Sequence, residues 1–358
     1  MKRLDYYIIK NFLSKLFLIL LSFLLIFFTV DIIDKLDKFS KYSLTNQEII
    51  DYYIYTLPEF ISFAFPVSLL LSTIFCFTLL QKNNEITALK ASGISLRRIS
   101  SSILIMGFLF SIISFFFDNY IVIDQLSKRN HIEKKLNPNK SNTLSRKNNI
   151  YYHVGDTFLG IKRFNFFNNI GQNISIQKSE GADVIYRIDA EKMIWQENNK
   201  KWLLKDINIR KWNKNKLNYY SIEDSLIDVK DISPEIIKKD NINPEDMSYW
   251  ELSLFIEKLK DKGLSYNRWL VNKNFKTAFA CSPLIMMVFG LALSIQKPRG
   301  NQASGVGLSI IVIFMYYLLI KFGQSLGYNN VINPFISVWM VNFIFLIFGS
   351  YLFLKSRT

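Results

Sequence analysis

Long apolar runs constrain this chain more than any other feature of its sequence. A membrane-spanning helix needs about 18 or more apolar residues. Five runs reach or approach that length, and Ala278–Ile295 is slightly shorter. The six runs are Phe12–Val30, Phe60–Leu80, Ile99–Phe117, Ala278–Ile295, Val306–Leu326 and Ile332–Leu354. The first run is too long for a cleaved signal peptide and lacks a small-residue cleavage site. We therefore predict an α-helical membrane protein with six transmembrane helices, arranged as three plus three.

The middle of the chain has a different character. Residues 130–246 are polar and rich in Asn and Lys. Apolar and polar residues alternate there with a period of two, which is typical of strands. Turn residues separate the candidate strands. The candidates are Ile150–His153, Thr157–Arg163, Ile174–Gln177, Val184–Ile188, Lys192–Gln196, Trp202–Arg210 and Leu217–Ile222. We predict an inserted all-β domain, a sandwich or jelly roll.

These patterns divide the chain into three parts. Residues 1–125 contain the first three spans, residues 126–246 the β domain, and residues 247–358 an amphipathic helix followed by the last three spans. Ser248 and Glu251 form a capping-box pattern ahead of that amphipathic helix. The first helix is expected to continue past its apolar run to about Lys41.

A short polar and basic stretch, Gln81–Arg98, separates the second span from the third. Its centre, residues 84–92, is rich in helix formers. Asn83 or Asn84 is placed to cap the start of a helix, and Gly93 to end it in the left-handed conformation.

The side chains of this short helix suggest a docking element. Ile86 and Leu89 are three residues apart and share one face, while Glu85 and Lys90 lie at its sides. A helix across the mouth of a bundle with one exposed acid has the form of a docking helix. From the residues alone, a plain surface loop between two spans remains the alternative.

The distribution of charge predicts the orientation of the chain. The net charge is +15, and the short flanks of the spans hold eleven Lys and Arg residues but only Asp5 and Glu85 as acids. With six spans, all these flanks fall on one side, which the positive-inside rule assigns to the cytoplasm. The β domain then lies outside, or in the periplasm of a double-membrane bacterium. We expect anionic lipid rather than nucleic acid as the partner of this charge.

The sequence lacks several common catalytic and nucleotide-binding motifs. It contains no G-x-x-x-x-G-K-[ST], G-x-S-x-G or H-E-x-x-H motif. The two cysteines and the two histidines form no disulfide or metal-ligand pattern. Lys321 is one of the few charges within a span and should face a cavity, a partner or the outer surface. We expect no metal and no catalytic residues.

Several segments together resemble one known family. They are the Asp5, Tyr7 and Phe12 pattern, YTLPEFISFAFPVSLLLSTIF at 55–75, NNEITALKASGISLRRI at 83–99, SYWELSLFIEKLKDKG at 248–263, and the turn QKPRGNQASGVGLSI. In these segments and in its overall plan the chain resembles the LptF/LptG family of lipopolysaccharide export permeases, with its length slightly favouring LptG.

The resemblance implies a non-catalytic half-transporter in the bacterial inner membrane. It would pair with a second LptF/LptG-type permease on an LptB-type ATPase dimer, where ATP and Mg²⁺ act, and this chain would bind no cofactor. Lipopolysaccharide would pass through the β domains to an LptC-type protein and a periplasmic bridge. The short helix would be the coupling helix, with the ATPase-coupling residues Glu85, Ile86, Leu89, Lys90, Ser92 and Gly93.

The resemblance also implies where the lipid binds. Family members carry basic residues at the far end of the first span, where this chain has Lys35, Lys38 and Lys41. Asp31 and Asp37 depart from that pattern, so three solvated lysines balancing nearby aspartates are the alternative. Further candidates for lipid contact are Phe27, Phe63, Phe65, Tyr317 and Lys321.

Two other functions are considered. The first is an envelope scaffold whose β domain only binds other envelope proteins. The second is a permease of the lipoprotein-release or macrolide-export type, but those carry four spans with a large domain after the first. The scaffold hypothesis predicts that Gln81–Arg98 is replaceable by a neutral linker.

Overall fold

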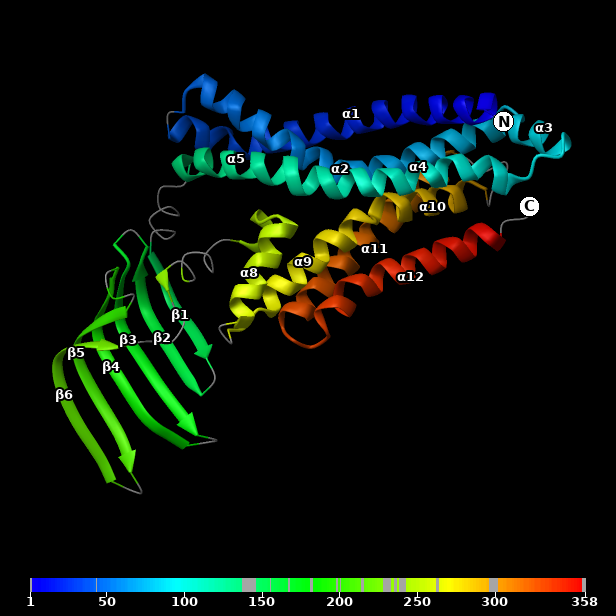
Figure 1. The fold of residues 1–358 in the computed structure, drawn as a ribbon. Coiled ribbons are helices and arrows are strands. Elements are labelled where there is room, and N and C mark those ends of the chain that lie inside the picture. The colour runs from blue at the N-terminus through cyan, green and yellow to red at the C-terminus, as the bar shows by residue number, and fades with distance from the viewer. Residues whose placement is uncertain are drawn as a thin grey trace. The chain divides into compact units, whose positions relative to one another are not determined.

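The computed structural model describes every residue except 1, 43, 137–145, 155, 167, 181–182, 198, 200, 214–215, 228–232, 235–236, 238–242, 262–263, 296–301 and 356–358. The chain divides into two compact units, which are considered separately (Figure 1). The helical unit consists of Met1–Ile132 and Asn267–Thr358, and the second unit is Glu133–Tyr266. The domain boundaries expected at 125/126 and 246/247 stay a prediction.

Long helices make up the helical unit. They are α1 (Lys2–Lys41), α2 (Asn46–Lys82), α3 (Glu85–Ala91), α4 (Leu96–Phe116), the π-helical η1 (Phe117–Val122), α5 (Ile123–Leu136), α9 (Asn267–Ala280), α10 (Ser282–Ile295), α11 (Gln302–Tyr328) and α12 (Pro334–Lys355). Among the described residues, five helices are long and apolar enough to span a membrane, and the pair α9–α10, bent by 41°, makes a sixth. The prediction of membrane helices around a β insert is confirmed.

Helices α1 and α2 are longer than their apolar runs. The expected extension of α1 to Lys41 is confirmed. Helix α2 begins at Asn46, well before its apolar run, because Thr45 and Glu48 form a reciprocal capping box. Pro66 therefore lies deep inside α2 rather than in its first turn.

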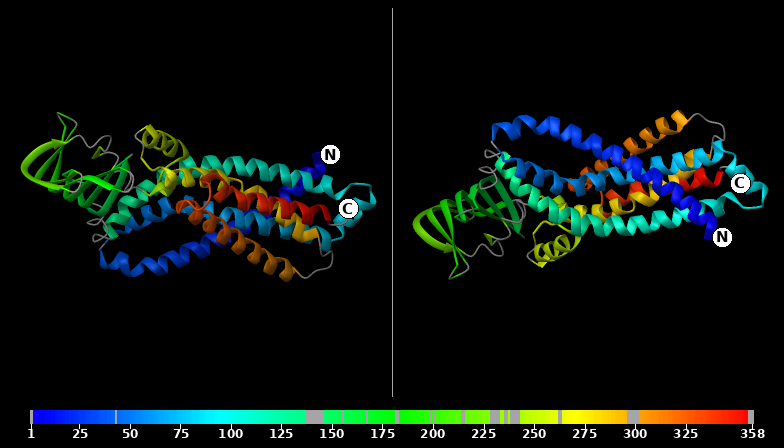
Figure 2. Two further views of the ribbon diagram at one scale, coloured as in Figure 1. Left: turned by 90° about the horizontal axis from the view of Figure 1, so that it is seen from below. Right: turned by 90° about the horizontal axis from the view of Figure 1, so that it is seen from above.

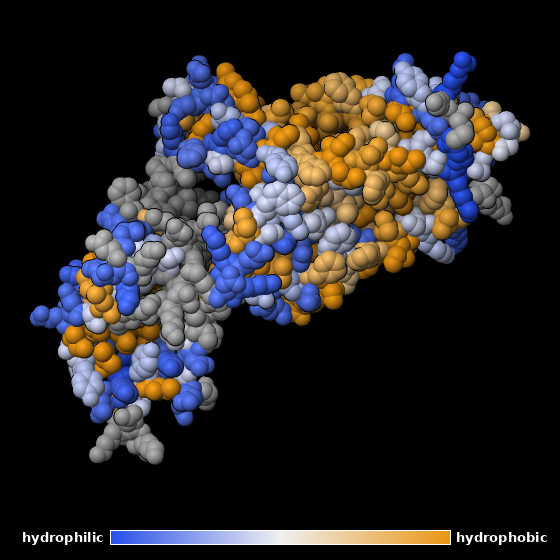
Figure 3. Space-filling model, viewed as in Figure 1, coloured by the Kyte–Doolittle hydropathy of each residue, from blue (hydrophilic) through white to orange (hydrophobic). Residues whose placement is uncertain are grey.

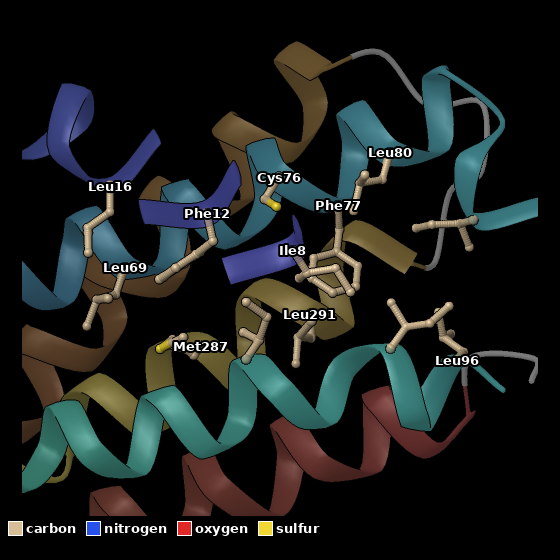
Figure 4. Packing of buried hydrophobic residues seen from close by; sticks show 13 residues of the cluster. Ile8, Phe12, Leu16, Leu69, Cys76, Phe77, Leu80, Leu96, Met287 and Leu291 are labelled. Carbon is tan, nitrogen blue, oxygen red and sulfur yellow. The ribbon is translucent and has the colours of Figure 1, made fainter. Parts of the chain in front are cut away.

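A buried core joins the helices around α3. Ile8, Phe12 and Leu16 of α1 point toward side chains of α2, α4 and α10 (Figure 4). Phe12 and Phe77 are fully buried there. A second cluster joins α2, α9, α10, α11 and α12. At Gly290 of α10 an added Cβ would lie 2.6 Å from Thr73 Cβ, so only glycine allows α2 and α10 to pack this closely.

The surface of the helical unit shows a membrane-like distribution of hydropathy. Apolar residues cover its middle and hydrophilic residues gather toward its two ends (Figure 3). The start of α1, helix α3 and the end of α12 lie at the same end, which is called the α3 end below (Figures 1 and 2). The opposite end, with residues 31–53, is called the far end. The basic residues Lys297, Arg299 and Arg357 lie outside the described residues.

The second unit contains one antiparallel sheet. Its strands are β1 (Arg146–Val154), β2 (Thr157–Asn165), β3 (Ile170–Glu180), β4 (Asp183–Gln196), β5 (Lys201–Asn213) and β6 (Lys216–Ile227). They pair in sequence order, each with the next, so the described strands form a meander (Figure 1). Trp202 and Phe164 lie in its apolar core. The all-β character of the insert is confirmed.

One detail of the strand prediction is wrong. The segments expected at Val184–Ile188 and Lys192–Gln196 form one strand, β4. Asn173 of β3 and Asp206 of β5 have positive φ and skip a partner beside Glu191 of β4. Within β4, exposed Glu191 and Lys192 separate buried Ala190 from buried Met193, so the in–out alternation shifts there while the pairing register continues unchanged.

The same unit contains η2 (Pro244–Asp246) and α8 (Tyr249–Asp261). The predicted capping box is present, since the Glu251 carboxylate accepts from Ser248 N and Ser248 Oγ accepts from Glu251 N. Leu252, Phe255, Ile256 and Leu259 are buried on one face of α8, as its pattern predicts. Gly263, expected to end this helix, lies outside the described residues.

Candidate functional site

Helix α3 is short and its two ends are fixed differently. At its C-terminal end Ile94 N donates to Leu89 O and Gly93 N donates to Lys90 O, both at 3.0 Å, which together form a Schellman motif. Gly93 has a φ of 84°, so its predicted left-handed role is confirmed. At the start, Asn84 occupies the N-cap position with φ 60° and makes no side-chain cap bond. The predicted side-chain cap is therefore wrong.

The two faces of α3 have distinct surroundings. Ile86 is buried in the core cluster, and Leu89 and Ile94 pack against the same cluster. This confirms the predicted shared face of Ile86 and Leu89. The opposite face is exposed and carries Thr87, Ala88, Lys90, Ala91, Ser92 and Gly93. A partner that binds this face therefore contacts a helix whose other face is packed into the core of the bundle.

Glu85 differs from the expected exposed acid. It is half-buried, and its Oε2 accepts a hydrogen bond from Tyr7 Oη of α1 at 2.8 Å. Its Oε1 accepts from Asn83 Nδ2 at 3.3 Å. The carboxylate is therefore held in one orientation at the edge of the exposed face.

A second bond joins α1 to the same region. Arg98 Nη1 and Nη2 donate to the two carboxylate oxygens of Asp5 at 2.8 and 2.7 Å, and Ser102 Oγ also donates to Asp5. Two parallel bonds of this kind fix the geometry of both side chains. The sequence reasoning gave no role to Asp5, Tyr7 or Arg98. Asp5 and Tyr7 appeared in it only as part of a family pattern.

The three far-end lysines of α1 are not equivalent. Lys35 Nζ lies 2.8 Å from Asp31 Oδ1 and donates to Tyr52 Oη, and its side chain is only 17% exposed. Lys38 is 45% exposed and lies 4.0 Å from Asp34. Lys41 is exposed, with its Nζ 5.8 Å from the Tyr42 ring centroid. Lys38 and Lys41 present ammonium groups to solvent, whereas Lys35 is neutralised within the helical unit.

The candidate aromatic residues fall into two groups. Phe27 contacts Phe60 with ring centroids 5.7 Å apart, and Tyr317 Oη donates to the carbonyl of Phe63 at 3.1 Å. These contacts bring together α1, α2 and α11. Phe65 instead packs against Phe110 of α4 at 5.3 Å and against the core cluster. It is a packing residue between α2 and α4.

Lys321 lies beside a buried polar network. Its Nζ donates to Gln324 Oε1 at 3.1 Å and lies 4.9 Å from the Phe275 ring centroid. Gln324 donates to Asn272 Oδ1 at 3.1 Å, and Tyr328 Oη donates to the same atom at 2.8 Å. The network joins α9 to α11, so Lys321 has structural partners.

The fold and these surfaces define a class. The chain is a multi-pass α-helical membrane protein with an inserted antiparallel sheet and a short helix exposed between two spans. A family model described as lipopolysaccharide export system permease LptF/LptG matches residues 6–355. The chain therefore belongs to the LptF/LptG family. A search of curated proteins finds no match.

Membership in this family gives the coarse function. The chain is a permease of a lipopolysaccharide export system, a component of a transporter rather than a catalyst. The family is located in the inner membrane, in agreement with the long apolar helices. The match does not distinguish LptF from LptG.

Proposed function

We propose that this chain is one half of the membrane part of an ATP-driven lipopolysaccharide exporter. A second permease of the LptF/LptG type completes the membrane part, and a separate LptB-type ATPase dimer binds both from the cytoplasm. ATP and Mg²⁺ act on that dimer, and this chain binds no cofactor. The observation that carries the proposal is that helix α3 exposes one face and packs the other into the core of the bundle.

In this mechanism α3 transmits the force. The ATPase contacts Lys90, Ser92 and Gly93 at the exposed face and Glu85 at its edge, while Ile86 and Leu89 anchor α3 in the core that includes α1, α2, α4 and α10. Because a packed core has discrete arrangements, closure of the ATPase dimer shifts the helices together. ATP binding thus biases the permease pair between an open and a closed cavity.

The lipid is proposed to bind along α1, α2 and α11. Lys38 and Lys41 are the best candidates for its phosphates, because their ammonium groups are exposed at the far end. Phe27, Phe63 and Tyr317 are proposed to contact acyl chains, since they lie where these three helices meet. The contacts that Lys35, Phe65 and Lys321 make within the helical unit make these three residues weaker candidates.

The orientation follows from the same arrangement. The α3 end faces the cytoplasm with both termini, and the sheet of the second unit lies in the periplasm. There it passes lipid to an LptC-type protein and the bridge beyond it. The basic residues of the α3 end support this orientation by the positive-inside rule.

The test is affinity purification from the native membrane. The wild-type chain is expected to retain an ATPase subunit, a second six-span permease and lipopolysaccharide. A Glu85→Lys variant is expected to retain the second permease and to lose most of the ATPase. The charge control is Asp183→Lys, an exposed acid of β4. Normal export after replacement of residues 84–92 by a neutral linker would contradict the proposal and favour an envelope scaffold.

A further inference from the structure

The first two turns of α1 lie directly against α3. Tyr7 Oη reaches 78 residues along the chain to Glu85 Oε2, with a donor–acceptor distance of 2.8 Å. The other oxygen of Glu85 accepts from Asn83, at the end of α2. Both oxygens of this carboxylate are therefore oriented, and one of them from a different helix.

The same two turns are also fixed from their other side. The bidentate Asp5–Arg98 pair binds α1 to the start of α4, two residues from Tyr7. Ile8 is 1% exposed and shares its cluster with Ile86 of α3 and Leu96 of α4. An ion pair, a hydrogen bond and an apolar contact thus surround a single stretch of α1.

We propose that Tyr7 is a positioning residue for Glu85, and that this contact couples the start of α1 to the docking helix α3. This inference rests on the proposed function and couples a second helix to its docking element. The phenol holds the Glu85 side chain in the orientation that the ATPase meets. It also makes the start of α1 move with α3, so that α1 responds directly to the ATPase.

The physical advantage is preorganisation. A glutamate at the first position of a seven-residue helix has several rotamers to lose when a partner binds it. A carboxylate already held by Tyr7 and Asn83 loses fewer, and binding is correspondingly tighter. Removing the phenol oxygen should therefore weaken ATPase binding by about three- to tenfold, the range expected when one more side chain has to be ordered on binding.

The experiment titrates the ATPase subunit into nanodiscs that hold this chain with its second permease. Tyr7→Phe removes only the phenol oxygen, and Tyr6→Phe is the matched control because Tyr6 is 68% exposed and one residue earlier. We expect Tyr7→Phe to raise the Kd about three- to tenfold and Tyr6→Phe to leave it unchanged. In a Glu85→Ala background, which unlike Glu85→Gln removes both acceptor oxygens, Tyr7→Phe should have little further effect on the Kd, because the two residues act through one bond.

The outcomes separate this inference from the proposed function. Loss of binding with Glu85→Ala but not with Tyr7→Phe overturns the positioning role alone. Additive effects in the double variant also overturn it. If Glu85→Ala itself leaves the Kd unchanged, the docking function of α3 is wrong as well. Thermal unfolding is measured in parallel. A fall in Tm for Tyr7→Phe without any change in Kd would assign Tyr7 a purely structural role.

Discussion

The two ends of α1 are held by different kinds of contact. At the α3 end, Ile8 and Phe12 are buried among aliphatic and aromatic side chains from four other helices, and Asp5 is paired with Arg98. At the far end, α1 contacts α2 through rings, such as Phe39 against Tyr52 with centroids 5.7 Å apart. Between the two ends the apolar side chains of α1 are mostly exposed, including Phe17, Leu18, Leu25 and Val30.

This difference indicates how α1 can work. A helix of this length is roughly 60 Å long and nearly rigid. Its α3 end cannot slide without uncovering a packed core, whereas the contacts described above for its far end are with α2. We therefore expect α1 to transmit displacement from α3 and its far end to move with the start of α2. The exposed middle is available to lipid or to a second permease.

The largest expected effect comes from breaking the α3 end. Phe12→Ala removes a fully buried ring and leaves a cavity, which should destabilise the helical unit by about 3–5 kcal/mol. Phe17→Ala, at a side chain that is 67% exposed, is the matched control and should cost little. Thermal unfolding of the solubilised exporter measures both. Equal losses of stability would mean that the α3 end is no better packed than the membrane-facing surface.

The next effect tests the far end. Lys35→Met removes the ammonium partner of Asp31, whose side chain is only 18% exposed, and should destabilise the unit by about 1–2 kcal/mol. Asp31→Asn in the same chain removes the stranded charge and should restore part of the lost stability. If Lys35→Met instead abolished lipid binding with no change in Tm, Lys35 would be a phosphate ligand rather than a structural residue.

A smaller effect is expected from the ion pair at the α3 end. Asp5→Asn removes the carboxylate charge that Arg98 meets, but leaves the apolar core intact. Its fall in Tm should be smaller than that of Phe12→Ala, and Arg98→Gln should have no further effect in the Asp5→Asn chain. A double-variant series followed by thermal unfolding gives the coupling. Full additivity would show that the two residues do not act as a pair.

The sequence was informative where contacts are local. Helix α3 was predictable because helix formers are followed by Gly93, and Ile86 and Leu89 repeat at helical spacing. The capping box at Thr45 and Glu48 was equally readable, and it would have given the true start of α2. Both features lie within one turn of helix.

Contacts between distant segments could not be read in this way. Nothing local in Tyr7 or Glu85 indicates that the two residues meet, and the family pattern assigned Glu85 to a partner only. The lysines of α1 looked alike in sequence, but Tyr52 of α2 lies beside Lys35 and not beside Lys38. The continuous strand β4 was missed because its in–out alternation shifts at Glu191 and Lys192, which are exposed between buried Ala190 and Met193.

The smallest effect on stability and the clearest effect on function should come from Lys38. It pairs with Asp34 at 4.0 Å, and both side chains are well exposed, so Lys38→Gln should change stability by less than about 0.5 kcal/mol. Binding of lipopolysaccharide should nevertheless weaken, because the ammonium is open to a phosphate. The measurement is binding of labelled lipopolysaccharide to the exporter in nanodiscs, at two salt concentrations.

Lys82→Gln, at an exposed lysine of the α3 end, is the control with the same change of charge. The wild-type chain should lose affinity as salt rises, and Lys38→Gln should reduce that dependence while Lys82→Gln leaves it intact. If Lys38→Gln and Lys82→Gln behaved alike, the far-end lysines would be solvated charges that balance their aspartates. The two ends of α1 would then differ only in packing, because the α3 end is buried in an apolar core and the far end contacts α2 through aromatic rings. The site that binds the lipid phosphates would then lie elsewhere on α1, α2 and α11.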